Sequence, residues 1–434
     1  MTASGRTVKA SFLDGERGFL ARDRKEETVN VSAPLLIVGT ESDNPFAIDL
    51  AVACGQVTDI ADLISLKTFA NSEFCPRFIE GDVDDMTTIG HQLAGATVVI
   101  VSTMSSVLTR NEIAWRSMIV ARAAKDNGAE RVVLVEPDLF YSAQDRGPRP
   151  EHGQVDFIRE AKDYKKFNGQ PFSSLLYAQM LALAGIDGVL TVHNHSVSVQ
   201  RLFTSIMPLF FHNLIPTEVY ADYIAHSDVT PSLRAGKGLL ICAPDKGARP
   251  FTTGIFQHLA AEYPVGHLFI AKQRLGERNV SSFIDPTSPC TLEDVTGRDV
   301  VVMDDMVRTG TTVMECCRLL KEAGAARVVF FVTHFYPSQE VRENLNSPYI
   351  DEIVTTNSLP PVQNRDLQGR LRKKLTVLKI GRWMACHVLS ALGYDPHCVR
   401  RPLYVIDMSS KNPRFDTLDA AAIGHLPESE IIAR

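Results

Sequence analysis

The sequence predicts an α/β protein with two lobes in tandem, each a mainly parallel sheet flanked by helices. Short apolar runs rich in β-branched residues alternate with amphipathic segments, which is the pattern of parallel strands joined by crossover helices. The chain has 434 residues, and at roughly 150 residues per domain this length predicts two or three domains. The segments NGAERVVLVEP and AGAARVVFFVTH also match in register, which hints at an internal duplication.

The first set of apolar runs predicts an N-terminal domain over residues 34–208. Strand-like runs lie at 35–39, 97–102, 131–136 and 188–192. Helical patterns accompany them, namely NPFAIDLAVACG, NEIAWRSMIVARAAKDNGA and SSLLYAQMLALAG. Between the third strand and the last of these helices, residues 147–169 are rich in charge, Pro and Gly, which indicates an exposed insertion with room for one short helix.

The second set predicts a C-terminal domain over residues 209–395. Its strand-like runs lie at 238–243, 267–271, 299–303, 327–335 and 351–356. Residues 1–33 are polar and charged and are expected to form an N-terminal extension. Residues 396–434 contain the strand-like PLYVIDM and then a polar tail, so they are treated as a separate C-terminal segment.

Composition narrows the class of protein. Hydrophobic residues make up 45% of the chain and charged residues 22%, which is the balance of a soluble globular enzyme. The net charge of −6 argues against a general nucleic-acid binder. No apolar run has the length of a signal peptide or a membrane span. Eight cysteines without a CxxC pair suggest neither a zinc ribbon nor a disulfide framework. We therefore expect a cytoplasmic protein without nucleic-acid or membrane partners.

The strongest chemical signal lies between Val300 and Val313, where an apolar strand runs into Asp304 and Asp305 and a helical pattern follows. A turn that delivers Gly310 and hydroxyl groups to a helix N-terminus favours a phosphate dianion, because free N–H groups and the helix dipole point there. Carboxylates at the carboxyl end of a parallel strand suit the hydroxyls of a ribose. The segment therefore predicts a site for a 5-phosphorylated ribose.

The alternative interpretation of this segment is structural. On that view the two acids only end a strand and Thr309 caps a helix. A nucleotide P-loop is absent because no Lys follows the glycine.

This segment resembles the phosphoribosyl pyrophosphate loop of type I phosphoribosyltransferases and, more closely, that of the ribose-phosphate pyrophosphokinase (phosphoribosyl pyrophosphate synthetase) family. The resemblance extends over about residues 34 to 395 and implies two tandem type I phosphoribosyltransferase-like lobes. It implies substrate-binding roles for Asp304, Asp305, Arg308, Thr309, Gly310, Thr311 and Thr312.

Two further segments resemble the catalytic parts of that family. HLFIAKQRLGERNV is similar to the start of its catalytic flexible loop, which implies that Lys272 and Arg274 are catalytic cations that neutralise charge on the transferred phosphates. LLICAPDKGARP and GVLTVHNHS are similar to the segments that hold Mg²⁺, which implies Asp245 and His195 as metal ligands. Taken alone, a KxR pair is usually a solvated strand end and an HxH pair is usually structural. His193 and His195 would share a face if the strand stays extended.

The nucleotide side also has counterparts. KTFANSEFCPRF resembles the ATP-binding hairpin loop of the family, which implies that Phe69, Asn71 and Glu73 bind ATP, with Asn71 in place of the usual Asp. FYSAQDR resembles the next adenine-side segment, with Gln144 in place and Ala143 where an Arg is expected.

Three more departures concern the acceptor and metal sides. Arg308 replaces an acidic residue of the sugar-phosphate loop, His193 replaces an Asp, and the insertion at 147–169 lengthens a short connection.

The resemblance implies an enzyme. It also implies a homo-oligomer, either a dimer or a hexamer, with ATP sites shared between subunits. The expected reaction is Mg²⁺-dependent transfer of pyrophosphate from ATP to ribose 5-phosphate, giving phosphoribosyl pyrophosphate and AMP. Two alternatives remain: the same reaction on another 5-phosphorylated pentose or a ribose phosphate ester, and a non-catalytic regulatory homologue of the synthetase. A phosphoribosyltransferase that attaches a base is disfavoured by the tandem lobes and the KQR segment.

Overall fold

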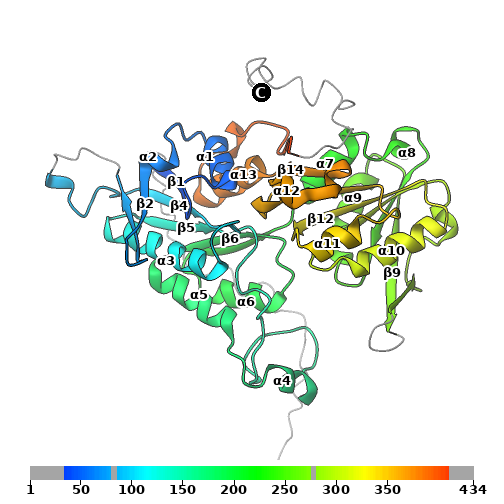
Figure 1. Cartoon of the computed structure of the whole chain (residues 1–434), viewed down its shortest axis with the longest axis horizontal. Coiled ribbons are helices and arrows are strands. Elements are labelled where there is room, and N and C mark those ends of the chain that lie inside the picture. The colour runs from blue at the N-terminus through cyan, green and yellow to red at the C-terminus, as the bar shows by residue number, and fades with distance from the viewer. Residues whose placement is uncertain (1–33, 80–85, 275–279, 410–434) are drawn as a thin grey trace, which may run out of the picture. The chain divides into compact units, whose positions relative to one another are not determined.

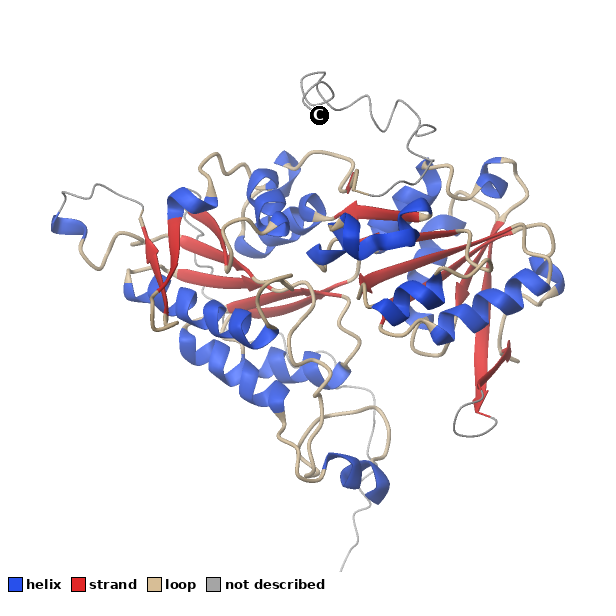
Figure 2. Cartoon of the chain, viewed as in Figure 1, coloured by secondary structure: helices blue, strands red, loops and turns tan. Residues whose placement is uncertain are grey.

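The computed structural model describes residues 34–79, 86–274 and 280–409, and the side chains of 272–274, 280 and 281 lie outside the description. In the described part, two mainly parallel sheets are flanked by helices (Figures 1 and 2). The predicted α/β class is therefore confirmed. The expected extension at 1–33 lies outside the described residues. None of the described helices is both long and apolar enough to cross a membrane.

The first sheet is entirely parallel, in the order β1-β4-β5-β6-β7. Its strands are β1 (Leu35–Gly39), β4 (Thr97–Val101), β5 (Arg131–Val135), β6 (Gly188–Val192) and β7 (Phe210–Leu214). Every residue of β4 and β6 is buried, as expected for parallel strands covered on both faces. β7 pairs with β6, so the first sheet extends past residue 208.

The helices of the first lobe flank this sheet, except for the one in the 147–169 insertion, which lies apart from it, and a separate hairpin lies outside the sheet (Figure 1). The helices are α1 (Pro45–Ala53), α2 (Ile60–Leu63), α3 (Arg110–Asp126), α4 (Ala161–Phe167), α5 (Ser173–Ala184) and α6 (Val197–Ile206), with a 3₁₀ turn at Met86–Thr88. The antiparallel hairpin is β2 (Ile64–Thr68) with β3 (Phe74–Phe78). α3 begins at a capping box between Thr109 and Glu112, which satisfies two N–H groups at its start.

The second sheet has the order β10-β9-β8-β11-β12-β13-β14-β15, and only its edge strands β10 and β15 are antiparallel. Its strands are β8 (Leu239–Ala243), β9 (Val265–Arg274), β10 (Val280–Ile284), β11 (Asp299–Val307), β12 (Arg327–Phe335), β13 (Glu352–Thr356), β14 (Leu375–Lys379) and β15 (Val405–Ile406). Its helices are α7 (Thr217–His226), α8 (Pro231–Arg234), α9 (Arg249–Ala260), α10 (Thr311–Glu322), α11 (Gln339–Leu345), α12 (Arg365–Gln368) and α13 (Gly381–Leu392), with 3₁₀ turns at Glu293–Val295, Pro360–Gln363, Gly369–Lys373 and Pro396–Cys398.

Alternation along β11 divides the apolar core of the second lobe between two faces. Val300 and Val302 pack into a cluster with residues of α10 and α11. Val301 and Met303 point the other way, into the larger cluster that also contains α13 and the first lobe. This strand is therefore fixed from both sides, and it holds its last residues at a defined place at the edge of the sheet.

The hinted duplication has a counterpart in side-chain contacts. In the first lobe Lys125 Nζ lies 2.7 Å from Asp187 Oδ2, and the same carboxylate accepts the backbone N–H of Val132 at 2.8 Å. In the second lobe Lys321 and Asp351 pair at the same distance, and Asp351 accepts an N–H at the start of β12 at 2.7 Å. The two residues joined by the N–H bond are 55 positions apart in the first lobe and 23 in the second, and the insertion in the first lobe accounts for most of the difference.

Candidate active site

The sugar-phosphate loop begins later than the sequence predicted. β11 does not end at Asp304 and Asp305 but continues to Val307, with Asp304 opposite Val332 of β12. Asp304 Oδ1 accepts the N–H of Asp305 at 3.0 Å. The two carboxylates therefore sit on a fixed strand near its carboxyl end, where parallel sheets place their ligands.

The turn after β11 presents a helix N-terminus. Gly310 is the N-cap of α10, with a left-handed φ of 82°, and Thr309 is not. A Cβ at Gly310 would lie 3.1 Å from Leu345 Cδ2, so glycine suits both the conformation and the space. Asn344 Nδ2 donates to the carbonyl of Thr309 at 2.8 Å and holds the turn from α11. The exposed or half-buried polar side chains of this turn are Arg308, Thr309, Thr311 and Thr312.

Four of the predicted residues come together from three segments. Asp304 is half-buried, and its pKa is raised well above its usual value by desolvation and by the neighbouring Asp305 and Asp245. His195 Nδ1 lies 3.6 Å from Asp305 Oδ2. β11, the β8–α9 connection and the β6–α6 connection thus deliver an acidic group and one imidazole to the same place.

His193 does not share the face of His195. β6 ends at Val192, and His193 adopts a positive φ of 47°, so the extended run that would align the two imidazoles is broken. His193 is buried against Phe251 and its Nδ1 lies 2.8 Å from Thr333 Oγ1. Burial lowers the pKa of His193 to about 3. His193 is therefore a neutral residue packed against the second lobe, whereas His195 is 44% exposed.

Asp245 sits at the turn into α9. Its Oδ1 accepts the N–H groups of Gly247 at 2.9 Å and Ala248 at 3.2 Å. Arg249, the first residue of α9, forms an ion pair with Asp285, which comes directly after β10. This pair fixes the start of α9, and thereby Asp245, against the residue that follows the C-terminal end of β10.

Lys272 and Arg274 are described only through their backbone. β8 ends at Ala243 opposite Phe269, so both residues lie on the part of β9 that continues past the carboxyl end of β8, paired with β10. Their positions two residues apart put them on one face of the strand. Their side chains lie outside the described residues.

The nucleotide-side residues form part of the first lobe. Phe69 to Glu73 close the β2–β3 hairpin through a bond from Phe69 N to Glu73 O of 2.8 Å, and Asn71 Oδ1 accepts the N–H of Glu73 at 3.2 Å. The ring of Phe69 is 43% exposed with Lys67 Nζ 5.0 Å from its centroid. In Figure 1 this hairpin stands at the outer edge of the first lobe. Gln144 is exposed, and its carbonyl accepts the hydroxyl of Ser174 at 2.8 Å.

One polar network near the site was not predicted. Asp138 is buried and pairs with Arg110, and it also accepts the hydroxyl of Tyr336, at the end of β12, at 2.6 Å. Burial alone would raise the pKa of Asp138, but His334 and Arg110 hold it below its usual value. Arg110 and Tyr336 lie 28 and 198 positions from Asp138 in the sequence, so no local sequence pattern predicts these contacts.

A cavity of about 590 Å³ contains none of the predicted residues. It is lined by α7, α9 and residues 401–404. The polar groups predicted for a sugar phosphate lie instead at the end of β11. Among the described residues, no three His, Cys, Asp or Glu side chains converge on a metal position.

Comparisons with known proteins match both lobes. A model of the phosphoribosyl transferase domain matches residues 230–359, which include the loop after β11. A ribose-phosphate pyrophosphokinase of Methanopyrus kandleri is 29% identical over 65% of this chain and 82% of its own length. One of Vibrio parahaemolyticus is 26% identical over 71% of this chain and 84% of its own. The crystal structure of phosphoribosylpyrophosphate synthetase from Mycobacterium smegmatis superimposes with a TM-score of 0.62 at 21% identity, over 83% of this chain and 99% of that one.

The fold and the loop after β11 define a protein with two phosphoribosyltransferase-like lobes. Relatives that match across both lobes narrow this class. The chain is similar to ribose-phosphate pyrophosphokinases, at 26% and 29% identity.

Proposed function

We propose that this protein transfers the β,γ-pyrophosphate of Mg-ATP to the anomeric hydroxyl of ribose 5-phosphate. The new bond joins the sugar oxygen to the β-phosphorus, the bond from that phosphorus to the oxygen bridging the α-phosphate breaks, and AMP leaves. The hydroxyl proton passes to solvent. The observation that carries the proposal is the meeting of Asp304, Asp305, Asp245 and His195 beside the start of α10.

The loop after β11 would bind the sugar phosphate. The N–H groups at the start of α10 and the hydroxyls of Thr309, Thr311 and Thr312 suit the 5-phosphate. Asp304 and Asp305 suit the two cis hydroxyls of the ribose. Arg308 is exposed next to this turn and adds a positive charge for the phosphate.

The acidic group would bind a divalent cation only with phosphate oxygens completing the ligand set, because no three His, Cys, Asp or Glu side chains of the described residues converge on a metal position. Desolvation and the neighbouring Asp305 and Asp245 raise the pKa of Asp304, and a bound cation would relieve this repulsion between like charges. His195 and Asp245 would hold Mg²⁺ together with phosphate oxygens, since Mg²⁺ is usually bound by few protein groups. When bound, Mg²⁺ supplies neutralisation of charge on the phosphates.

Lys272 and Arg274 would stabilise the transition state from the extended part of β9. Phe69, Asn71, Glu73 and Gln144 would bind ATP, with the exposed ring of Phe69 available for stacking on adenine. Because the hairpin stands at the edge of its own lobe, we propose that a second copy of the chain supplies it, as a dimer or hexamer would. The expected compartment is the cytoplasm, in keeping with eight free thiols.

The test is the release of AMP when the purified chain meets Mg-ATP and ribose 5-phosphate. Lys272→Ala should abolish turnover and leave the assembly size unchanged by light scattering, whereas Lys237→Ala, at an exposed turn of the second lobe, should behave as wild type. Absence of AMP with every sugar phosphate offered would contradict the proposal and favour a non-catalytic regulatory homologue.

A different 5-phosphorylated acceptor is the second candidate, and Arg308 favours it. This residue replaces an acid of the family pattern, is exposed and makes no ion pair with any described residue. A panel of pentose 5-phosphates and ribose phosphate esters should be compared for AMP release by wild type and Arg308→Asp. Clear preference of both proteins for plain ribose 5-phosphate would dispose of this candidate.

A further inference from the structure

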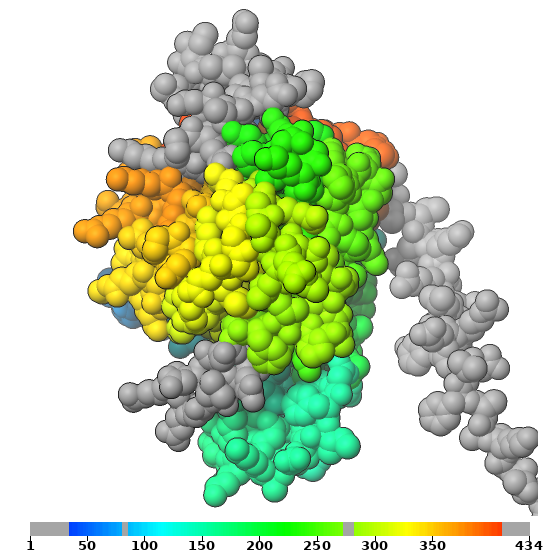
Figure 3. All heavy atoms as spheres, turned by 90° about the vertical axis from the view of Figure 1, so that its right-hand side faces the viewer, coloured from blue at the N-terminus to red at the C-terminus, as the bar shows by residue number. Residues whose placement is uncertain are grey.

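The insertion at 147–169 is ordered around one buried arginine. The side chain of Arg159 is only 4% exposed. It donates to the carbonyls of Gly147 at 2.8 Å and His152 at 2.9 Å, and to Asp163 Oδ2 at 2.6 Å. Figure 3 shows the insertion, in blue-green, at the surface of the molecule. A planar guanidinium with several fixed acceptors holds the segment in one conformation.

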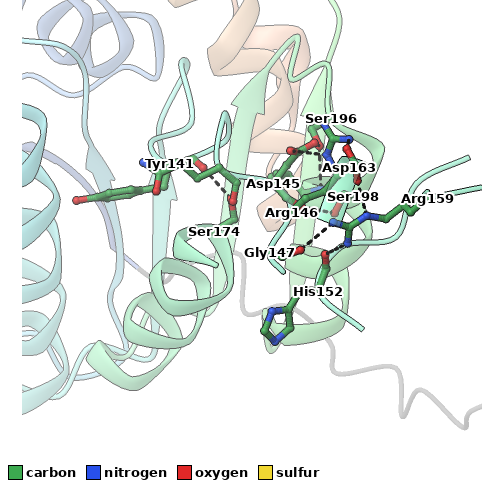
Figure 4. Close-up of polar contacts among 12 residues, drawn as sticks. Tyr141, Asp145, Arg146, Gly147, His152, Arg159, Asp163, Ser174, Ser196 and Ser198 are labelled. Atoms are coloured by element: carbon green, nitrogen blue, oxygen red, sulfur yellow. Dashed lines mark hydrogen bonds and ion pairs between the residues drawn. The ribbon is translucent and has the colours of Figure 1, made fainter. Parts of the chain in front are cut away.

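From Arg159 the contacts continue through Asp163 and Asp145 to Ser196 (Figure 4). Asp163 also pairs with Arg146 at 2.9 Å, and Arg146 Nε lies 3.3 Å from Asp145 Oδ1. Asp145 Oδ2 accepts the hydroxyl of Ser196 at 2.8 Å. Since Ser196 directly follows His195, the insertion is joined to the proposed metal ligand through an unbroken row of polar contacts.

The insertion also touches this row through its backbone. Gly153 has a φ of +100°, and a Cβ there would lie 2.7 Å from the carbonyl oxygen of Asp145 and 2.8 Å from Arg146 Cγ. That same carbonyl accepts the hydroxyl of Ser198, on the first turn of α6, at 2.7 Å. Asp145 is therefore enclosed by the insertion on one side and by the start of α6 on the other.

Asp145 stands between two parts of the proposed site. On its N-terminal side is Gln144, whose carbonyl is held by Ser174 at the start of α5. On the other side its carboxylate holds Ser196, next to His195, which faces Asp305 at 3.6 Å. The position of Asp145 thus sets the spacing between the nucleotide-side segment and the metal-side segment.

We propose that the insertion at 147–169 is a clamp for Mg-ATP, in which Arg159 and Asp145 are positioning residues that fix Gln144 and His195 relative to each other. The proposal rests on the function proposed above. Neither residue needs to touch ATP. Removing Arg159 takes a donor from the carbonyls of Gly147 and His152 and from Asp163 Oδ2, which frees the insertion. Residues that orient metal ligands typically contribute about 10- to 100-fold to metal affinity.

The test measures binding without turnover. The full-length chain is titrated in a calorimeter with Mg²⁺ and α,β-methylene-ATP, an analogue whose α–β bridge is not cleaved. Arg159→Ala and Asp145→Ala should each weaken binding about tenfold. The matched control is Arg201→Ala. It removes an ion pair of 2.9 Å between Arg201 of α6 and Asp156 of the insertion, whose side chains are both exposed. It should bind within about twofold of wild type.

A second pair of variants keeps the test valid if Arg159→Ala folds poorly. Ser196→Thr retains the hydroxyl that donates to Asp145 and should bind as wild type, whereas Ser196→Ala should bind as weakly as Asp145→Ala. Wild-type affinity in Asp145→Ala and Arg159→Ala would overturn the clamp, and so would equal losses in Arg201→Ala. If the wild-type protein neither binds the analogue nor releases AMP, the proposed function fails. If the wild-type protein binds the analogue and releases AMP, and the variants bind with the same affinity, only the clamp proposal fails.

Discussion

Gly310→Ala tests the phosphate-binding turn most directly. The φ of 82° at Gly310 costs an alanine about 1–2 kcal/mol. The added Cβ would also lie 3.1 Å and 3.3 Å from the two nearest atoms of Leu345, a fully buried side chain. Because Leu345 is packed in the core on all sides, the turn has to move instead, by a few tenths of an ångström.

Such a shift should disturb the N–H groups at the start of α10. A hydrogen bond to a charged group contributes about 1.5–3 kcal/mol, so loss of one bond to the 5-phosphate should raise KM for ribose 5-phosphate by about tenfold or more. The assay is the rate of AMP release as a function of ribose 5-phosphate at saturating Mg-ATP. KM for Mg-ATP should change by less than about twofold.

The control separates backbone strain from the effect on the turn. Gly297 has a similar φ of 72°, and a Cβ there meets no atom within 4 Å. Gly297→Ala should lower the free energy of unfolding by about 1–2 kcal/mol and leave KM for ribose 5-phosphate unchanged. If Gly310→Ala keeps the wild-type KM, or if both variants raise it equally, α10 does not hold the phosphate as argued.

Three further predictions concern stability and specificity. Burial raises the pKa of Glu136 from 4.5 to about 7, so the folded protein keeps a proton that the unfolded chain has lost, and its stability falls as pH rises from about 4.5 to 7. Glu136→Gln should remove this dependence and stabilise the fold at pH 8 by up to about 3 kcal/mol. Urea unfolding at several pH values measures this, and an unchanged slope of stability against pH would contradict it. Tyr336→Phe removes one hydrogen bond to the buried Asp138 and should lower the free energy of unfolding by about 2 kcal/mol; a loss below about 0.5 kcal/mol in urea would mean that this contact does not join the lobes. Arg308→Asp should raise KM for ribose 5-phosphate several-fold without changing the unfolding midpoint, and an unaltered KM would remove Arg308 from the acceptor side.

The sequence predicts those parts of the fold in which local pattern and tertiary environment agree. The apolar run at 299–303 has the pattern of a buried strand, and β11 is that strand. The short helix expected in the insertion is α4. The hairpin around Phe69 forms with its loop where the resemblance implies it. In each case the signal comes from residues close together in the chain.

The rest depends on contacts between distant residues. β11 runs on through two aspartates because β12 supplies a partner as far as Val307, which overrides the poor strand propensity of Asp. His193 leaves the extended conformation while its ring packs against Phe251 and Thr333 of the other lobe. β7 and β14 were not predicted as strands at all, and each forms along an already ordered neighbour.

The repeated contact between a helix-end lysine and the aspartate that precedes the second strand after that helix makes each lobe a reference for the other. Lys125 and Lys321 pair with Asp187 and Asp351 at the same distance, so the same substitution can be introduced in both halves of one molecule. Where the two outcomes agree, the effect belongs to the shared architecture. Where the two outcomes differ, the difference measures how the insertion changes the first lobe relative to the second.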